Sequence, residues 1–123
     1  LVVAESFGGR LTAFDLGADG ELANRRLWAQ LPEGAVPDGI CLDAEGAIWV
    51  ASPTTNQCLR LREGGEVTDV VELDRGAFAC MLGDEDRRTL YVCSAQDSDP
   101  AKSAARTARI ERVRVTVTGA GLP

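Results

Sequence analysis

The residue whose type and position best suit chemistry is Asp38, which stands between Pro37 and Gly39. Two apolar runs follow it, and the segment 43–46 between them has the composition of a tight turn. Because the second run must return antiparallel to the first, Asp38 should lie at the end of the hairpin away from the turn, with Ser52 close to it. A carboxylate held there can bind a cation or act as a general base; alternatively, Pro-Asp-Gly is only a favourable turn.

The residue types that are missing narrow this chemistry. The chain has no histidine, which excludes Ser-His and Cys-His catalysis within it. Its four cysteines form no C-x-x-C pair, so a Cys/His zinc site is not supported. They fall in apolar, strand-like runs and are expected to be small buried hydrophobes: Cys41, Cys58, Cys80 and Cys93. Carboxylates, hydroxyls and amides remain, and these are ligands for a hard cation such as calcium.

Composition limits the class of protein and its partners. The 123 residues suit one small domain, taken as residues 1–123, and a hydrophobic content of 45% is enough for a core. The net charge of -6 argues against nucleic acid or an anionic membrane as a partner. No apolar run approaches the roughly 18 residues of a membrane span. Because Leu1 already lies in a strand-like run, we expect the chain to begin inside a domain.

A repeat of about the length of a propeller blade runs through the chain. Three apolar strands resemble each other, at residues 1–5, 48–52 and 90–94, with offsets of 47 and 42 residues between them. Polar turns and further strands follow, so that the repeating unit is four short strands. A β-sandwich also has short strands and frequent turns, but the recurrence of one strand at a long offset favours a β-propeller.

This repeat accounts for about ten antiparallel strands, a fragment of roughly two and a half blades. The first blade lacks its innermost strand, and the second, residues 38–73, is complete. The third begins with residues 78–82 and ends with residues 108–117, where broken alternation predicts a bulge near Glu111 and Arg112. Strand edges left open in this way require the missing N-terminal blades or self-association.

Two further polar residues are expected at the same mouth as Asp38. Glu5 and Ser52 align with Ser94 in the repeat, and all three end a second strand. Glu5 and Ser52 are therefore candidates to support Asp38 or to face a substrate, although a solvated strand end accounts for Glu5 more simply. Phe78 stands where Asp38 would recur in the next blade, whereas a purely structural turn would tend to repeat. Asp43 is interpreted as an ordinary turn residue.

The stretches that carry a family resemblance cover nearly the whole chain. They are LVVAESFGGRLTAFDL, ELANRRLWAQL, PDGICLDAEGAIWVAS, TLYVCSA and RIERVRVTVTGAGLP. With them the sequence resembles the C-terminal portion of the SMP-30/gluconolactonase/LRE-like family, which includes regucalcin. The resemblance implies a six-bladed β-propeller with a divalent cation in its channel, usually calcium and sometimes zinc or another divalent ion.

The resemblance also implies an activity and a role for Asp38. Family members hydrolyse lactones, and Asp38 matches the aspartate that both binds the cation and serves as general base. The cation would polarise the lactone carbonyl and acidify a water molecule, and Asp38 would take the proton of that water. The family's other ligands, a glutamate and an asparagine, have no counterpart in this chain, which therefore carries one member of the site.

The sequence thus predicts part of a metal-dependent lactone hydrolase of the gluconolactonase type, with an incomplete site. One rival hypothesis is a non-enzymatic propeller that serves as a binding scaffold, and another is a different esterase on the same scaffold. A small lactone is the expected partner, and the cytoplasm is the expected location.

Overall fold

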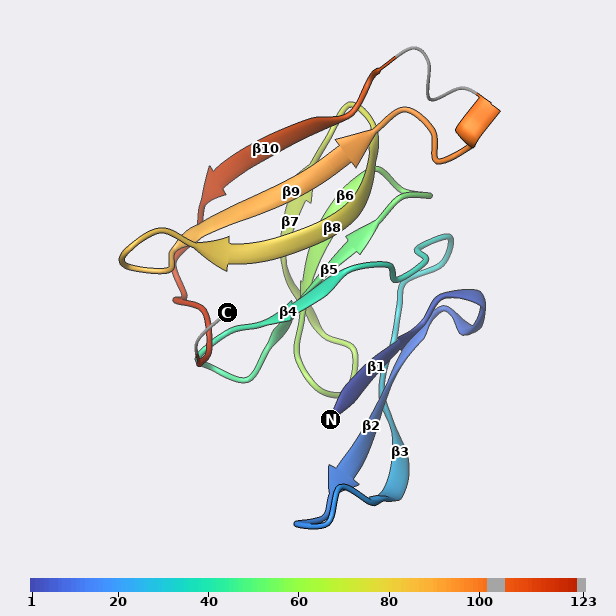
Figure 1. Cartoon of the computed structure of the whole chain (residues 1–123), viewed down its shortest axis with the longest axis vertical. Coiled ribbons are helices and arrows are strands. Elements are labelled where there is room, and N and C mark those ends of the chain that lie inside the picture. Colours follow the sequence, from blue (N-terminus) through green and yellow to red (C-terminus); the bar gives the residue numbers. More distant parts are fainter. Residues whose placement is uncertain (102–105, 122–123) are drawn as a thin grey trace.

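The computed structural model describes residues 1–101 and 106–121, which form three antiparallel sheets (Figure 1). The first sheet contains β1 (Val2–Glu5), β2 (Arg10–Leu16) and β3 (Leu22–Gln30). The second contains β4 (Ile40–Leu42), β5 (Ile48–Ser52), β6 (Gln57–Leu61) and β7 (Val67–Glu72). The third contains β8 (Gly76–Gly83), β9 (Thr89–Ala95) and β10 (Arg109–Arg114). The 3-10 turn η1 (Ser6–Gly8) joins β1 to β2, and no helix of the described residues is long and apolar enough to cross a bilayer.

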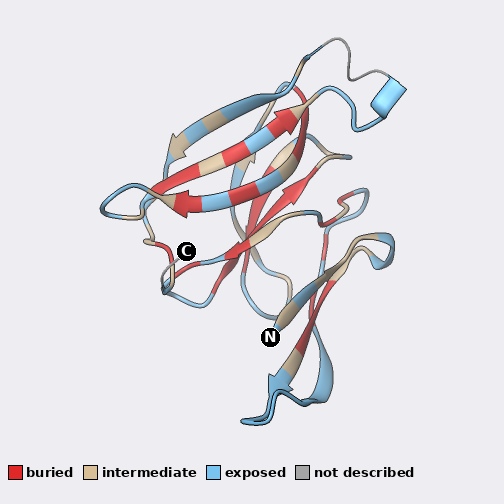
Figure 2. Cartoon of the chain, viewed as in Figure 1, coloured by how far each residue is buried: buried red, intermediate tan, exposed pale blue. Residues whose placement is uncertain are grey.

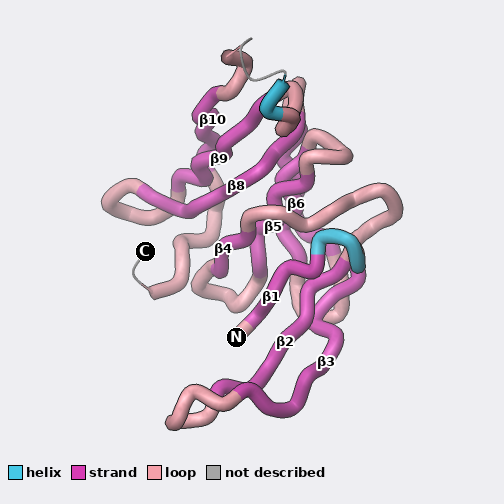
Figure 3. Tube along the Cα trace, turned by 45° about the vertical axis from the view of Figure 1, so that its right-hand side comes forward, coloured by secondary structure: helices cyan, strands magenta, loops and turns pink. Residues whose placement is uncertain are grey.

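Each sheet is a meander in which strands adjacent in sequence are also adjacent in space, and the three meanders follow one another along the chain (Figure 3). The described residues therefore contain the predicted number of strands in the predicted three sectors. The third sheet packs on the second because β8 contacts β4, β5 and β6. The first strands of these two sheets, β4 and β8, thus lie side by side.

The hairpin of β4 and β5 closes as its turn residues require. Gly46 takes a left-handed backbone conformation with φ of 79°, which its missing side chain permits, and its N–H donates to the Asp43 carbonyl at 3.1 Å. The register pairs Ile40 with Val50 and Leu42 with Ile48. This register sets Asp38 and Asp43 at opposite ends of one short strand.

The hydrophobic core consists of two clusters, one on each side of the second sheet. Figure 2 colours the buried residues red, and β5 is buried along its whole length. Ile48 and Val50 of β5 pack toward the first sheet, against Leu11 and Trp28. Trp49 packs in the other cluster, with residues of the third sheet. Because successive side chains of a strand point to opposite faces, a strand buried on both faces needs a continuous apolar run, which is the sequence that β5 has.

The predicted bulge in the last strand is wrong. Residues of β10 pair with those of β9 in an unbroken register from Arg109 with Ser94 to Arg114 with Thr89. The alternation is regular once Ile110, 75% exposed, is assigned to the outer face and Val113 to the core. The strand also ends earlier than predicted, because the following residues leave β9 to bond the β4–β5 turn, as the Ala44 N–H donates to the Thr118 carbonyl.

Three of the four cysteines are buried as expected, and one is not. Cys41, Cys58 and Cys80 lie in the cluster between the second and third sheets. Cys93 is exposed, because the core side of β9 is formed by Val92 and Ser94 and the residue between them points outward. All four are free thiols.

Candidate functional site

Asp38 lies directly before β4, where three backbone hydrogen bonds fix the chain. Its N–H donates to the Ala51 carbonyl at 2.9 Å, so that Asp38 lies beside the end of β5, as predicted. Gly39 donates its N–H to the Phe78 carbonyl and accepts from the Ala51 N–H, each at 2.9 Å. The segment is therefore bonded both within its own sheet and to the innermost strand of the next.

Gly39 is required by a close approach between these two sheets. A Cβ atom built on Gly39 would lie 2.6 Å from the Ala79 Cα and 3.0 Å from the Phe78 carbonyl oxygen. Backbone atoms cannot move aside as a flexible side chain can, so a larger residue would displace β4 from β8. The sequence indicated a small residue here, but only the tertiary structure shows what it contacts.

The Asp38 carboxylate is exposed, and among residues 1–101 and 106–121 it has no hydrogen-bond or ion-pair partner. If Pro-Asp-Gly served only as a turn, the carboxylate would be expected to accept neighbouring backbone N–H groups, as turn aspartates commonly do. The carboxylate oxygens remain available to a ligand, on a backbone that is held at both neighbouring residues.

Ser52 is fully buried and bonds the loop that leads to Asp38. Its Oγ accepts the Val36 N–H at 3.2 Å and the Thr55 hydroxyl at 2.8 Å, and it lies 3.4 Å from the Thr54 hydroxyl. The structure thus places Ser52 where it holds the approach to Asp38 through the backbone, while its own hydroxyl is buried.

Glu5 is surrounded by donors at the end of β1. Its carboxylate accepts from Arg10 at 2.7 Å, from Arg25 at 2.8 Å and from the Thr12 hydroxyl. Hydrogen bonds from Arg10, Thr12 and Arg25 lower the pKa of Glu5 to about 2. Glu5 therefore stays ionised at neutral pH, and its oxygens are already engaged.

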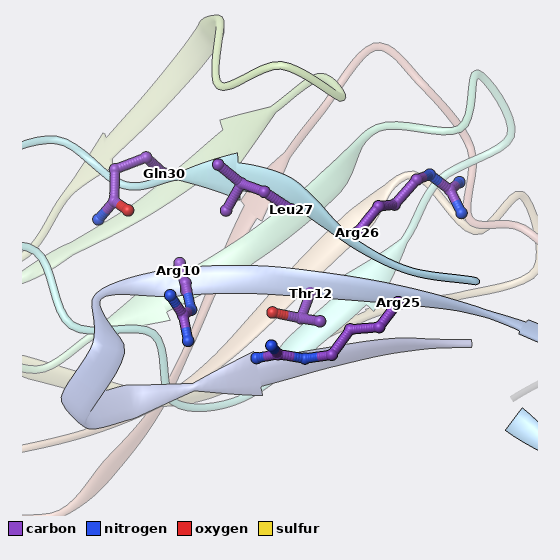
Figure 4. Close-up of a pocket in the computed structure, with 6 residues that line it drawn as sticks. All are labelled: Arg10, Thr12, Arg25, Arg26, Leu27 and Gln30. Atoms are coloured by element: carbon purple, nitrogen blue, oxygen red, sulfur yellow. The ribbon is translucent and has the colours of Figure 1, made fainter. Parts of the chain in front are cut away.

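A polar pocket of about 190 Å³ lies beside this cluster on the first sheet, and Figure 4 shows its lining: Arg10, Thr12, Arg25, Arg26, Leu27 and Gln30. The Arg26 guanidinium lies 3.1 Å from Glu63 and 3.4 Å from Asp15, so it is paired like the other two arginines. The sequence showed this pocket only as scattered basic residues on β2 and β3. Pairing across those strands brings them together.

Asp43, at the far end of β4, is not the ordinary turn residue that the sequence indicated. One carboxylate oxygen accepts the Glu45 and Ala47 N–H groups at 2.9 and 3.0 Å. The other accepts from Arg60 Nε at 2.6 Å, and both side chains are buried. The signal that was missed is Arg60, a charged residue on the apolar strand β6, which required a buried partner.

The described residues contain no cluster of metal ligands. No group of three or more His, Cys, Asp or Glu side chains among them is arranged to hold a metal ion. Calcium normally takes six to eight oxygen ligands. An exposed and unpaired carboxylate such as Asp38 fits the role of one such ligand, whereas Glu5 and Asp43 are already saturated by protein donors.

Comparison with known proteins places the chain in a family. The profile described as SMP-30/Gluconolactonase/LRE-like region matches residues 1–96. The chain belongs to this family. It is 31% identical over 119 residues to a 6-deoxy-6-sulfogluconolactonase of Pseudomonas putida, covering 92% of this chain and 41% of that protein. It is 36% identical over 98 residues to the regucalcin of Gallus gallus, and this alignment covers 76% of this chain and 32% of that protein. The chain thus spans about two fifths or less of the length of these relatives.

Solved structures confirm the β-propeller class. A luciferin-regenerating enzyme is similar in structure, with a TM-score of 0.74 and 23% sequence identity. The superposition covers 98% of this chain and 41% of that enzyme's chain. A calcium-binding regucalcin from Agrobacterium tumefaciens has a TM-score of 0.76 and 21% sequence identity. That superposition covers 96% of this chain and 42% of the regucalcin chain. A gluconolactonase from Xanthomonas campestris is 28% identical, with a TM-score of 0.58 over 69% of this chain and 27% of its own. The three sheets are therefore blades of a partial propeller.

Proposed function

We propose that the chain contributes Asp38 to a metal-dependent lactone hydrolase that opens sugar lactones of the gluconolactonase type. The observation that carries this proposal is the Asp38 carboxylate, exposed and without a protein partner, on a backbone bonded to two sheets. Membership of a family named for gluconolactonase supports the reaction, as does the similarity to a sulfogluconolactonase. Two other acids, Glu5 and Asp43, are engaged by arginines, so Asp38 is better suited to the role than either.

In this proposal Asp38 is both a cation ligand and the general base. Asp38 would help to hold a divalent cation, most simply calcium, and that ion would supply polarisation of the lactone carbonyl and a lowered pKa for a nearby water. One Asp38 oxygen takes the proton of the attacking water, which adds to the carbonyl carbon. The ring C–O bond then breaks, and the leaving oxygen takes that proton back from Asp38. Gly39 and Ser52 position Asp38 through the backbone, and Glu5 holds Arg10 and Arg25 at the end of β1.

The proposal requires further ligands, because the described residues form no cluster that could hold a metal ion together with Asp38. We assign their supply to N-terminal blades or to a second copy of the chain, with a small lactone as the partner. The four free thiols support a reducing compartment, which is consistent with the cytoplasm.

The test compares two substitutions that each remove one exposed carboxylate, Asp38→Asn and Glu33→Gln. Glu33 lies in the loop before Asp38 and is exposed, so its loss controls for surface charge. The substitutions are made in a polypeptide that contains this chain and the blades that complete the site. Lactone hydrolysis is measured at saturating calcium or zinc, and metal affinity is measured separately.

Asp38→Asn is expected to lower turnover by roughly 10²–10⁴-fold, the usual contribution of a general base. Saturating metal should not restore the rate, because the amide cannot accept the proton. Glu33→Gln should leave turnover unchanged. If both variants hydrolyse the lactone at the parental rate, Asp38 is not the base, and a non-enzymatic scaffold becomes the better hypothesis.

A further inference from the structure

Two thiols meet where the innermost strands of the second and third sheets lie side by side. Cys41 is the central residue of β4 and Cys80 belongs to β8. Their sulfur atoms are 3.9 Å apart, although 39 residues separate them in the sequence. Both side chains are buried, and neither has a role in the proposed hydrolysis.

We propose that Cys41 and Cys80 are an oxidisable dithiol, which a hydroperoxide converts into a disulfide joining β4 to β8. A disulfide requires the sulfurs to close from 3.9 Å to about 2.05 Å. The Gly39 N–H bond to the Phe78 carbonyl already fixes the two strands at close approach. Side-chain rotation, with little movement of the strands, can therefore supply the remaining approach.

The environment divides the roles of the two thiols. A hydrogen bond from Cys80 lowers the pKa of Cys41, and donation of the same bond raises the pKa of Cys80. We therefore assign the attack to Cys41, the more acidic of the two thiols, since the thiolate is the reactive form. Cys41 is also among the residues that line an open groove of about 300 Å³ beside β4, although its side chain packs in the cluster between the second and third sheets.

The reaction balances with a hydroperoxide as the oxidant. The Cys41 thiolate attacks one peroxide oxygen, the O–O bond breaks, and the products are Cys41 sulfenic acid and hydroxide. The Cys80 sulfur then attacks the Cys41 sulfur and displaces the hydroxyl group, which leaves as water with the Cys80 proton. In total two thiols are oxidised, one hydrogen peroxide is reduced, and two water molecules form.

The disulfide would also change a contact next to Asp38. The Cys80 Sγ lies 3.6 Å from the Gly39 carbonyl oxygen and 3.6 Å from that of Trp49. The single S–H of Cys80 can serve only one of its neighbouring acceptors at a time, and oxidation removes it, so that neither carbonyl then has a donor at this position. The dithiol itself is independent of the proposed lactone hydrolysis, because its formation requires no metal and no lactone.

The test is disulfide mapping after treatment of the folded chain with hydrogen peroxide. The exposed Cys93 is first changed to Ser, so that it cannot join two chains. Free thiols are then blocked with N-ethylmaleimide, and the chain is cut with trypsin and with a protease that cleaves after glutamate. Glu45 lies between Cys41 and Cys58, so the second protease separates these two thiols onto different peptides.

The expected result is a disulfide-linked pair of peptides, one containing Cys41 and the other Cys80. The linked pair should be about 2 Da lighter than the two reduced peptides together, and dithiothreitol should separate it again. The denaturation midpoint should rise by about 10 °C. Cys58→Ser should preserve the link, whereas Cys41→Ser and Cys80→Ser should abolish it. A link from Cys58 to Cys80, or peroxide products without any link in a chain whose circular dichroism shows it folded, would overturn the proposal. Mapping on the Cys93→Ser chain decides the matter even if another variant fails to fold.

Discussion

The two ends of β4 carry the same residue type in opposite states. Asp38, before the strand, is exposed, and its carboxylate has no partner among the described residues. Asp43, after the strand, is fully buried and bonds two backbone N–H groups and the Arg60 guanidinium. Only Gly39 and the three residues of β4 separate these two environments. The difference shows that a carboxylate bonded by its own protein supports the fold, whereas an unbonded one remains available for a ligand.

Asp43→Asn should give the largest effect on stability. The substitution leaves the buried Arg60 guanidinium without its closest anion, since Glu45 and Asp69 also contact it but are exposed. Removing one partner of a buried ion pair typically costs about 3–5 kcal/mol. We expect a loss of about 3 kcal/mol or more in the free energy of unfolding, measured by urea denaturation with an unchanged slope. Parental stability would mean that the ion pair contributes little.

Gly39→Ala should give the second largest loss of stability, and it tests how the structure positions Asp38. The new methyl group would meet the Ala79 Cα at 2.6 Å, and overpacking of this kind costs about 1–3 kcal/mol. Gly34→Ala is the matched control for the loss of glycine freedom in the same loop, because its added Cβ comes no closer than 3.9 Å to its neighbour. Since Gly34 has φ of 80°, its substitution carries backbone strain without a clash. A denaturation midpoint of Gly39→Ala equal to that of the parent would contradict the role of close approach at Gly39.

Glu5 sharpens the comparison because it is ion-paired like Asp43 but partly accessible like Asp38. Its folded pKa of about 2 lies below the ordinary value of 4.5, so its contacts stabilise the fold above about pH 4.5. That stability is lost as the pH falls toward 2 and the carboxylate is protonated. Glu5→Gln should therefore flatten the acid limb of the stability profile, with a smaller loss at neutral pH than Asp43→Asn. An acid limb identical to that of the parent would contradict this assignment.

Asp38→Asn should have the smallest effect on stability. An exposed carboxylate without a partner can be replaced at a cost of about 0.5 kcal/mol or less. The same urea titration that detects the Asp43→Asn loss should therefore leave the Asp38 variant within error of the parent. A large destabilisation would show that Asp38 supports the turn, and the contrast between the two ends of β4 would disappear.

Much of the architecture could be predicted because strands leave a local signal. The repeated apolar run at residues 1–5, 48–52 and 90–94 marks equivalent strands, and all three are found as second or first members of their sheets. The bulge predicted near Glu111 was wrong because an exposed Ile110 was assigned to the core. Alternation alone does not say which face is covered. That information comes from the neighbouring sheet, which covers only one face of β10.

By itself, the sequence excluded histidine-dependent catalysis and determined the position of Asp38 in a hairpin, because residue types and turn composition are local properties. The tertiary structure decided which of these side chains are buried and which partners they bond. Arg60 reaches Asp43 from β6, Arg10 and Arg25 reach Glu5 from β2 and β3, and the Cys41–Cys80 contact joins two sheets. Strand pairing within one blade brings the arginines to Asp43 and to Glu5, whereas only the packing of two blades brings Cys41 to Cys80. For this reason three acids that look alike in the sequence differ in pairing and burial.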